Sequence, residues 1–150
     1  LNNNQEVMEH IERIRGMAAQ KIGFVEDYME ARTKATSAPK VSIVSAPQDY
    51  VNMDGKTVSP DAMDLCVRAI SVGMLHKAYP MTVAVASGAA AKIPGTIVSE
   101  LVRPVEGDII RLGHSSGVTE VDMKMDGENV LKGGVTRTAR RIMDGYVYIR

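Results

Sequence analysis

The chain has 150 residues, of which 45% are hydrophobic and 24% are charged. This length and composition are typical of one globular domain with a single core. Its 18 lysines and arginines equal its 18 aspartates and glutamates, so no excess of positive charge indicates binding to nucleic acid or to an anionic membrane. Any anion must therefore be bound locally, by backbone amides and a few side chains.

The sequence also argues against several kinds of site and location. A single cysteine, Cys66, excludes an internal disulfide and fits a reducing, cytoplasmic location. No apolar run approaches the roughly 20 residues of a membrane-spanning helix. Three widely spaced histidines and the absence of nucleotide-binding glycine motifs predict no metal and no cofactor. The start, Leu1 to Gln5, is polar, unlike a signal sequence, and lacks a methionine, so we expect the chain to begin inside a longer protein.

The first part of the chain predicts a helix, a loop and a strand. Apolar residues recur at three-to-four spacing between residues 7 and 22, after asparagines at residues 2–4 that can cap a helix. Gly23 is the expected end of this helix. Residues 30–39 are polar and small, which predicts a loop, and residues 41–44 form a short β-branched run, which predicts a strand.

A turn and a second helix are predicted next. Asp54-Gly55 is a turn signal. Ser59-Pro60-Asp61 combines a capping serine, a proline at the first helical position and an acid in the first turn, which indicates a helix start. The apolar face of this helix would comprise Met63, Val67 and Ile70, with Gly73 near its end.

Residues 82–91, TVAVASGAAA, are small and apolar on every side. A helix that is apolar all round is buried, and small side chains let neighbouring elements approach its backbone. We therefore predict a buried central helix that ends at Pro94-Gly95. Because Val83 and Val85 alternate with alanine, a buried strand remains an alternative for the first half of this segment.

From Thr96 onward the sequence predicts β structure. Residues 118–125 alternate between polar and apolar, as in a half-buried strand, and Asp144-Gly145 is a hairpin signal. The predicted strands are residues 96–102, 108–112, 118–125, 135–143 and 146–149. Helices followed by a run of strands indicate an α+β fold, and a sheet curled around the buried helix would satisfy both features.

A series of short motifs resembles the PrpF family in the same order. They are Pro39-Lys40-Val41, Asp49-Tyr50, Asp64-Leu65 with Arg68, Ser71-Val72-Gly73, His76-Lys77-Ala78, Ile93-Pro94-Gly95-Thr96, Gly113-His114-Ser115-Ser116-Gly117 and Arg137-Thr138-Ala139-Arg140-Arg141. Val72 and Ser115 depart from the methionine and proline that are usual in the family, which bears on substrate identity. The family includes 2-methylaconitate cis–trans isomerases, methylitaconate isomerases and oxalomesaconate tautomerases, and the resemblance covers nearly the whole chain.

This resemblance implies a diaminopimelate-epimerase-like fold, with two similar halves, each a barrel-like sheet around a central helix, and an active site between them. Residues 1–150 would be the C-terminal half, and the N-terminal half of the same protein would carry the catalytic lysine and cysteine. Lys77 and Cys66 do not correspond to those two, so no catalytic residue is assigned here, and Cys66 is expected in the core. The implied function is cofactor-independent, proton-shifting isomerisation of a small unsaturated di- or tricarboxylic acid.

The start of the central helix is the best candidate for anchoring a substrate carboxylate. The amides of Met81, Thr82 and Val83 would lie at the positive end of the helix dipole, although Thr82 could simply cap its own helix. His76, just before the helix, could bind a carboxylate or relay a proton, or could be structural. Ser71 belongs to the same candidate set.

The segment from Gly113 to Gly117 is a second candidate, because small residues between two strands can expose successive amides to an anion. His114, Ser115 and Ser116 would add side-chain donors, and an ordinary hairpin is the alternative reading.

Two other functions stay open. A half-domain that forms a homodimer, with a second copy replacing the missing half, could bind a small anion without turnover. A diaminopimelate-epimerase-like racemase would need a cysteine at the head of the central helix, where Met81-Thr82 stands, so this reading is disfavoured.

Overall fold

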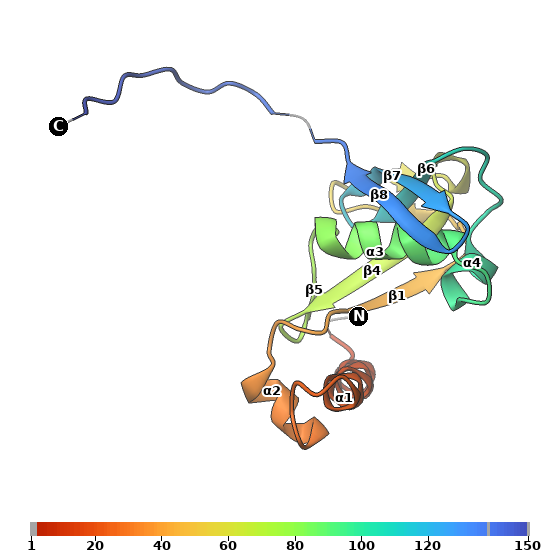
Figure 1. The fold of residues 1–150 in the computed structure, drawn as a ribbon, viewed down its shortest axis with the longest axis vertical. Helices are drawn as coiled ribbons and strands as arrows, with labels where there is room; N and C mark the ends of the chain where they lie inside the picture. Colours follow the sequence, from red (N-terminus) through yellow and green to blue (C-terminus); the bar gives the residue numbers. More distant parts are fainter. Residues whose placement is uncertain (1–2, 138, 150) are drawn as a thin grey trace.

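The computed structural model describes residues 3–137 and 139–149 (Figure 1). The helices are α1 (Gln5–Lys21), η1 (Tyr28–Glu30), α2 (Ala31–Lys34), η2 (Pro60–Ala62), α3 (Met81–Lys92) and α4 (Ile97–Leu101), where η marks a 3-10 helix. The strands are β1 (Val41–Ser45), β2 (Tyr50–Val51), β3 (Thr57–Val58), β4 (Leu65–Ser71), β5 (Met74–Leu75), β6 (Ile109–His114), β7 (Gly117–Asp126) and β8 (Asn129–Val135). Leu1, Asn2 and Thr138, which belong to the predicted N-terminal segment and to the predicted strand over residues 135–143, lie outside the described residues.

One mixed sheet organises the chain, with the strand order β1-β4-β6-β7-β8 and with β5 paired to β4. β4 and β6 run parallel, pairing Leu65 with Leu112, while the other neighbours are antiparallel. Parallel neighbours need a long crossover, and the segment that holds α3 and α4 supplies it. The sheet curls around α3 (Figure 1), which confirms the predicted α+β half-barrel.

Helix α3 packs against β7 and β8 through its small residues. A Cβ added at Gly88 would lie 2.8 Å from Met123 Cγ and 3.0 Å from Val121 Cγ1, so glycine allows the close approach. The core around the buried Ala84 includes Leu65, Val67, Ile110, Leu112, Val121 and Met123. The predicted central helix is confirmed, and the strand alternative for its first half is excluded.

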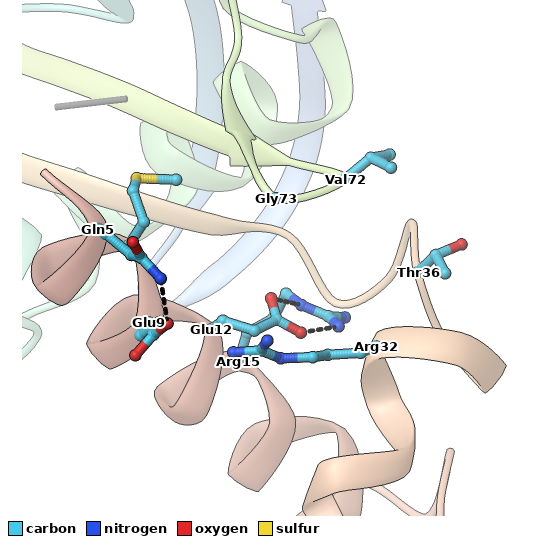
Figure 2. Close-up of a pocket in the computed structure, with 9 residues that line it drawn as sticks. Gln5, Glu9, Glu12, Arg15, Arg32, Thr36, Val72 and Gly73 are labelled. Atoms are coloured by element: carbon cyan, nitrogen blue, oxygen red, sulfur yellow. Dashed lines mark hydrogen bonds and ion pairs between the residues drawn. The ribbon is translucent and has the colours of Figure 1, made fainter. Parts of the chain in front are cut away.

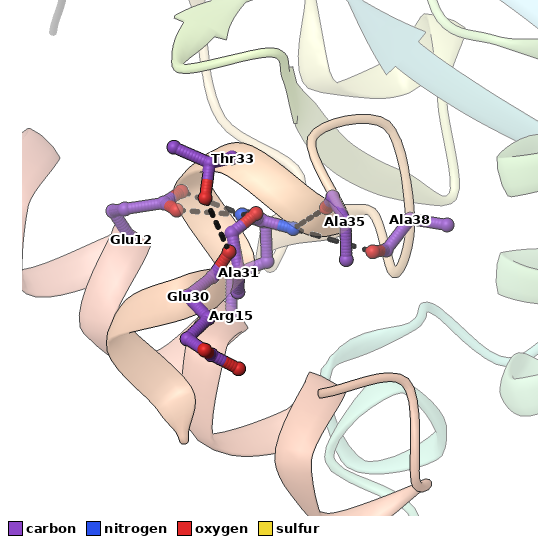
Figure 3. Close-up of polar contacts among 7 residues, drawn as sticks. All are labelled: Glu12, Arg15, Glu30, Ala31, Thr33, Ala35 and Ala38. Carbon is purple, nitrogen blue, oxygen red and sulfur yellow. Dashed lines mark hydrogen bonds and ion pairs between the residues drawn. The ribbon is translucent and has the colours of Figure 1, made fainter. Parts of the chain in front are cut away.

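Arg15 fastens the N-terminal helices together (Figure 3). Its side chain is 4% exposed, and Nε and Nη2 donate to the Glu12 carboxylate at 2.8 and 2.6 Å. Nη1 donates to the carbonyls of Ala35 and Ala38, and Nη2 also donates to that of Ala31. The guanidinium thus satisfies five acceptors, which holds residues 31–38 against α1.

Three predicted elements are wrong in type. Residues 59–73 are not a helix: the Ser59 cap starts only η2, and β4 follows, with the Val72-Gly73 turn leading to β5. Cys66 is buried as expected, but on this strand. The short apolar run fits both periodicities, and pairing with β1 and β6 favours the strand.

The other two corrections concern helices that the sequence did not predict. Residues 96–102 contain α4, because Thr96 Oγ1 caps it by accepting from Ser99 N at 3.0 Å. The predicted loop over residues 30–39 contains α2, which the Arg15 contacts stabilise.

The last predicted strands do not form. β8 ends at Val135, and the described residues after it are extended without strand pairing (Figure 1). Among the helices in the described part of the chain, none is long and apolar enough to cross a membrane.

Candidate functional site

A pocket of about 410 Å³ lies beside β4, between the β2–β3 hairpin and the segment that follows β5. Its lining residues are Val51, Asn52, Met53, Arg68, Leu75, His76, Lys77 and Ser115. Arg68 and Lys77 carry positive charge, His76 adds an imidazole, and none of the lining residues has a carboxylate. We call it the basic pocket, and its charge suits a carboxylate-bearing ligand.

Arg68 is the fixed cation of the basic pocket. Its Nη1 donates to the carbonyls of Val67 and Gly113 at 2.7 and 3.2 Å, and its guanidinium lies 4.4 Å from the centre of the Tyr50 ring. Within the described residues, Nε and Nη2 donate to no acceptor. These two groups form the edge of a guanidinium that binds a carboxylate bidentately, so Arg68 is held in place with its binding edge available.

The ring of Tyr50 contacts the Arg68 guanidinium, and its hydroxyl binds both ends of the β6–β7 turn. Its hydroxyl donates to the carbonyls of His114 and Gly117, at 2.9 and 2.7 Å. Desolvation by burial raises the pKa of Tyr50 above its ordinary value, although the charge of Arg68 opposes this. Tyr50 therefore stays a neutral donor that fixes the β6–β7 turn beneath the pocket.

Two further contacts fix the pocket walls. The amide of Met53 donates to the carbonyl of Ser115 at 2.8 Å, which ties the β2–β3 hairpin to the β6–β7 turn. Ser116 Oγ donates to the carbonyl of Lys77 at 2.6 Å, which ties the same turn to the segment before α3. The turn is therefore the common support of both walls.

His114 is buried behind this turn and does not line the pocket. Ser116 N donates to its Nδ1 at 3.2 Å, so Nε2 carries the proton and donates to Thr119 Oγ1 at 2.8 Å. Its ring stacks on Tyr79 with centroids 6.3 Å apart. Burial, and then the charge of Arg68, lower the pKa of His114, which favours the neutral ring.

The predicted site residues are thus only partly brought together. His76 and Ser115 line the basic pocket, and Ser116 supports it from the turn. His76 Nδ1 lies 2.8 Å from the carbonyl of Ala78, which orients the ring. Ser71 ends β4, pairs with Met74 and is absent from the lining.

The first turn of α3 follows directly on residues 76–80, a segment whose first two residues, His76 and Lys77, line the basic pocket. The N-cap is Pro80, with no side-chain cap, and the first helical hydrogen bond is that of Ala84 N to the Pro80 carbonyl. The amides of Met81, Thr82 and Val83 therefore lack helical partners. Thr82 is exposed and does not cap its helix, so this alternative is wrong.

Arg68 is the residue that sequence reasoning missed as a ligand group. The sequence signal for such a residue is an arginine inside the otherwise apolar run LCVRAIS. Its neighbours at the pocket come from β2, β6 and the segment after β5, and of these β2 and β6 lie far from it in sequence.

A second cavity, of about 320 Å³, lies between α1, α2 and the Val72–Gly73 turn (Figure 2). Its charged lining comprises the carboxylates of Glu9 and Glu12, Arg32, and Arg15, whose five donors are already used. The carboxylates make this cavity less suitable for an acidic ligand than the basic pocket. In the part of the chain that the structure describes, no group of three His, Cys, Asp or Glu side chains could hold a metal ion.

Over its whole length the chain is similar in sequence to a protein family and to several named isomerases. Residues 1–150 match the family model described as PrpF protein. The chain is 39% identical to a 3-methylitaconate isomerase of Eubacterium barkeri, over 99% of this chain and 40% of that protein. It is 37% identical to a 2-methyl-aconitate isomerase of Shewanella oneidensis, over 99% of this chain and 38% of that protein.

A solved structure shows the same relation. The crystal structure of a methylitaconate-delta-isomerase superposes with a TM-score of 0.90 at 39% identity, covering 98% of this chain and 38% of that one. The chain therefore spans about two fifths of the length of the relatives that it matches.

Proposed function

Because the chain belongs to the PrpF family, we propose that it is the C-terminal half of an isomerase that shifts a proton within a small unsaturated di- or tricarboxylic acid. Its relatives are named as isomerases of 3-methylitaconate, 2-methyl-aconitate and, at 31% identity in a Novosphingobium strain, (4E)-oxalomesaconate. Their shared substrate chemistry is a carbon–carbon double bond next to carboxylates. Buried Cys66 is compatible with a cytoplasmic location for this protein.

The proposed reaction needs one base and one acid. The base removes an allylic proton, the electron pair delocalises towards a carboxylate as a dienolate-like intermediate, and the proton returns at another carbon. Fixed donors that bind the carboxylate stabilise the charge that develops there. The N-terminal half would supply the acid and base, and this chain would supply the donors, without a cofactor.

The observation that carries this proposal is the available edge of Arg68 in a pocket without carboxylates. Arg68 would bind one substrate carboxylate bidentately, with Lys77, His76 and Ser115 around it. The exposed first turn of α3, including Thr82, would take a second carboxylate, because the segment from His76 to Pro80 joins it to the pocket.

The end of the chain supports a contact with the N-terminal half. Large apolar side chains there are at least four-fifths exposed, and the only ion pair among the described residues of this segment joins Arg141 to Asp144. These exposed side chains are Ile142, Met143, Tyr146, Val147, Tyr148 and Ile149. Large apolar side chains exposed in this number are typical of an interaction site. The proposed partner is the counterpart of the roughly three fifths of the relatives' length that this chain does not match.

The test is steady-state kinetics of the full-length protein with the three acids named above. Arg68→Gln should raise KM by about tenfold to a hundredfold, because a charge-assisted bidentate contact is lost. Arg68→Lys should recover part of the loss. Arg103→Gln is the control, since Arg103 pairs with Asp61 and lies outside the pocket lining.

Two outcomes would contradict the proposal. Unchanged kinetics in Arg68→Gln would remove the basic pocket from the site. Binding of the acids by a dimer of residues 1–150, with no turnover by the full-length protein, would favour the anion-binding half-domain instead.

A further inference from the structure

One face of α1 carries four apolar side chains that the rest of the described chain leaves exposed or half-buried, and the exposed His10 lies on the same arc. Ile14 and Met17 are 49% and 53% exposed, and Val7 and Ala18 are half-buried. At about 100° per residue, these four side chains lie within roughly 100° of the helix circumference. We call them the α1 stripe.

The stripe lies away from the elements that pack on α1. The other side of the helix contacts η1 closely, since a Cβ on Gly16 would collide with the carbonyl of Tyr28. Arg15 and Ala19 are buried towards that side, and Ile11 is buried at the edge of the stripe, next to Ala18. The exposed members of the stripe, Ile14 and Met17, therefore lie outside the face by which α1 joins its own chain.

Two unpaired charges lie at opposite ends of the same face. Glu6 is in the first turn of α1 and Lys21 is in the last, and both side chains are exposed. Neither makes an ion pair with another described residue. Their separation of 15 positions corresponds to roughly 22 Å along the helix axis.

We propose that the α1 stripe is a self-association surface, on which α1 of a second copy of this chain packs antiparallel. A two-fold axis near Ile14 would place Ile14 against its own counterpart and bring Glu6 of each copy next to Lys21 of the other. A face with complementary charges at its two ends matches itself when reversed, as an isologous interface requires. This pairing leaves the basic pocket unused, so it does not depend on the proposed function.

Charge reversal in the full-length protein tests the pairing. Glu6→Lys and Lys21→Glu, each alone, should raise the dimer dissociation constant by about tenfold, because each creates two like-charge contacts per dimer. The double variant should return to the wild-type value. Glu26→Lys, an exposed charge change outside α1, is the matched control. Sedimentation velocity over a concentration series measures all four.

A cross-linking variant tests the axis itself. Ile14→Cys should form a disulfide between copies under mild oxidation, since such a bond needs Cα atoms within about 7 Å. Gln20→Cys, on another side of α1, should not cross-link, and native Cys66 is buried. A protein that is monomeric at every concentration would overturn the proposal. Charge variants that lower the melting temperature without changing the sedimenting mass would also overturn it. In that case another part of the same polypeptide, and not a second copy, would cover the stripe.

Discussion

At the scale of single residues, Tyr79 joins three parts of the fold. Its hydroxyl lies 2.7 Å from Ser42 Oγ on β1 and 2.7 Å from Ser87 Oγ on α3, and its ring stacks on His114. Burial raises the pKa of Tyr79, although its two serine partners lower it, so the phenol stays neutral.

Tyr79→Phe should lower the free energy of unfolding by about 1–3 kcal/mol, because the buried Ser87 hydroxyl and the half-buried Ser42 hydroxyl lose their shared partner. Urea denaturation of the chain measures this. Tyr146→Phe, at a position that is 96% exposed, should be neutral. Equal stability of Tyr79→Phe and wild type would show that the two serines pair with each other.

His114 predicts a pH dependence of stability. Its folded-state pKa lies below the ordinary value of 6.5, so the unfolded chain binds more protons as the pH falls past 6.5. The contribution is therefore complete above about pH 6.5 and is lost as the pH falls towards the folded-state pKa. Thermal unfolding between neutral and mildly acidic pH should show a steeper loss in wild type than in His114→Gln. Identical slopes would contradict a buried, neutral His114.

At the scale of elements, the approach of α3 to β7 depends on Gly88. Alanine is the better helix former by about 1 kcal/mol. Overpacking against the buried Val121 and Met123 costs about 1–3 kcal/mol, and we expect this cost to exceed the gain. Gly88→Ala should thus be less stable than Gly134→Ala, since a Cβ at Gly134 meets nothing within 4 Å. A Gly88→Ala variant that melts higher than wild type would show that β7 moves readily.

The predicted and observed elements differ where local pattern and pairing compete. α1 and β7 follow from the spacing of their apolar residues, and β1 and α3 follow from their composition, a β-branched run and a run of small apolar residues. β4 is buried along both faces, so its apolar residues keep no period of two and were read as a helix. The strands predicted after Val135 have β-prone residues but no described strand beside them.

The residues of the basic pocket also divide into those that local motifs predict and one that only tertiary pairing places. His76 and Ser115 could be predicted from short motifs, and both line the basic pocket. Arg68 joins them only because β4 and β6 pair in the register that sets Cys66 opposite Gly113. The sequence contains no local signal for that parallel register, which is decided by tertiary packing.

At the scale of the whole molecule, the chain is a curled sheet around α3 with two surfaces left unpartnered. The α1 stripe faces away from the chain's own helices, and the exposed apolar end beyond β8 extends from the sheet (Figure 1). We assign the first to a second copy and the second to the N-terminal half. In this proposed arrangement the basic pocket would contribute anchoring groups to a site that an N-terminal half would complete.

The most direct measurement of the central proposal is proton NMR of the full-length protein with 3-methylitaconate, 2-methylaconitate and (4E)-oxalomesaconate. We predict that at least one acid is converted to its double-bond isomer without added cofactor, and that conversion at low substrate concentration slows in Arg68→Gln. No conversion of any of the three acids by the folded full-length protein would contradict the account.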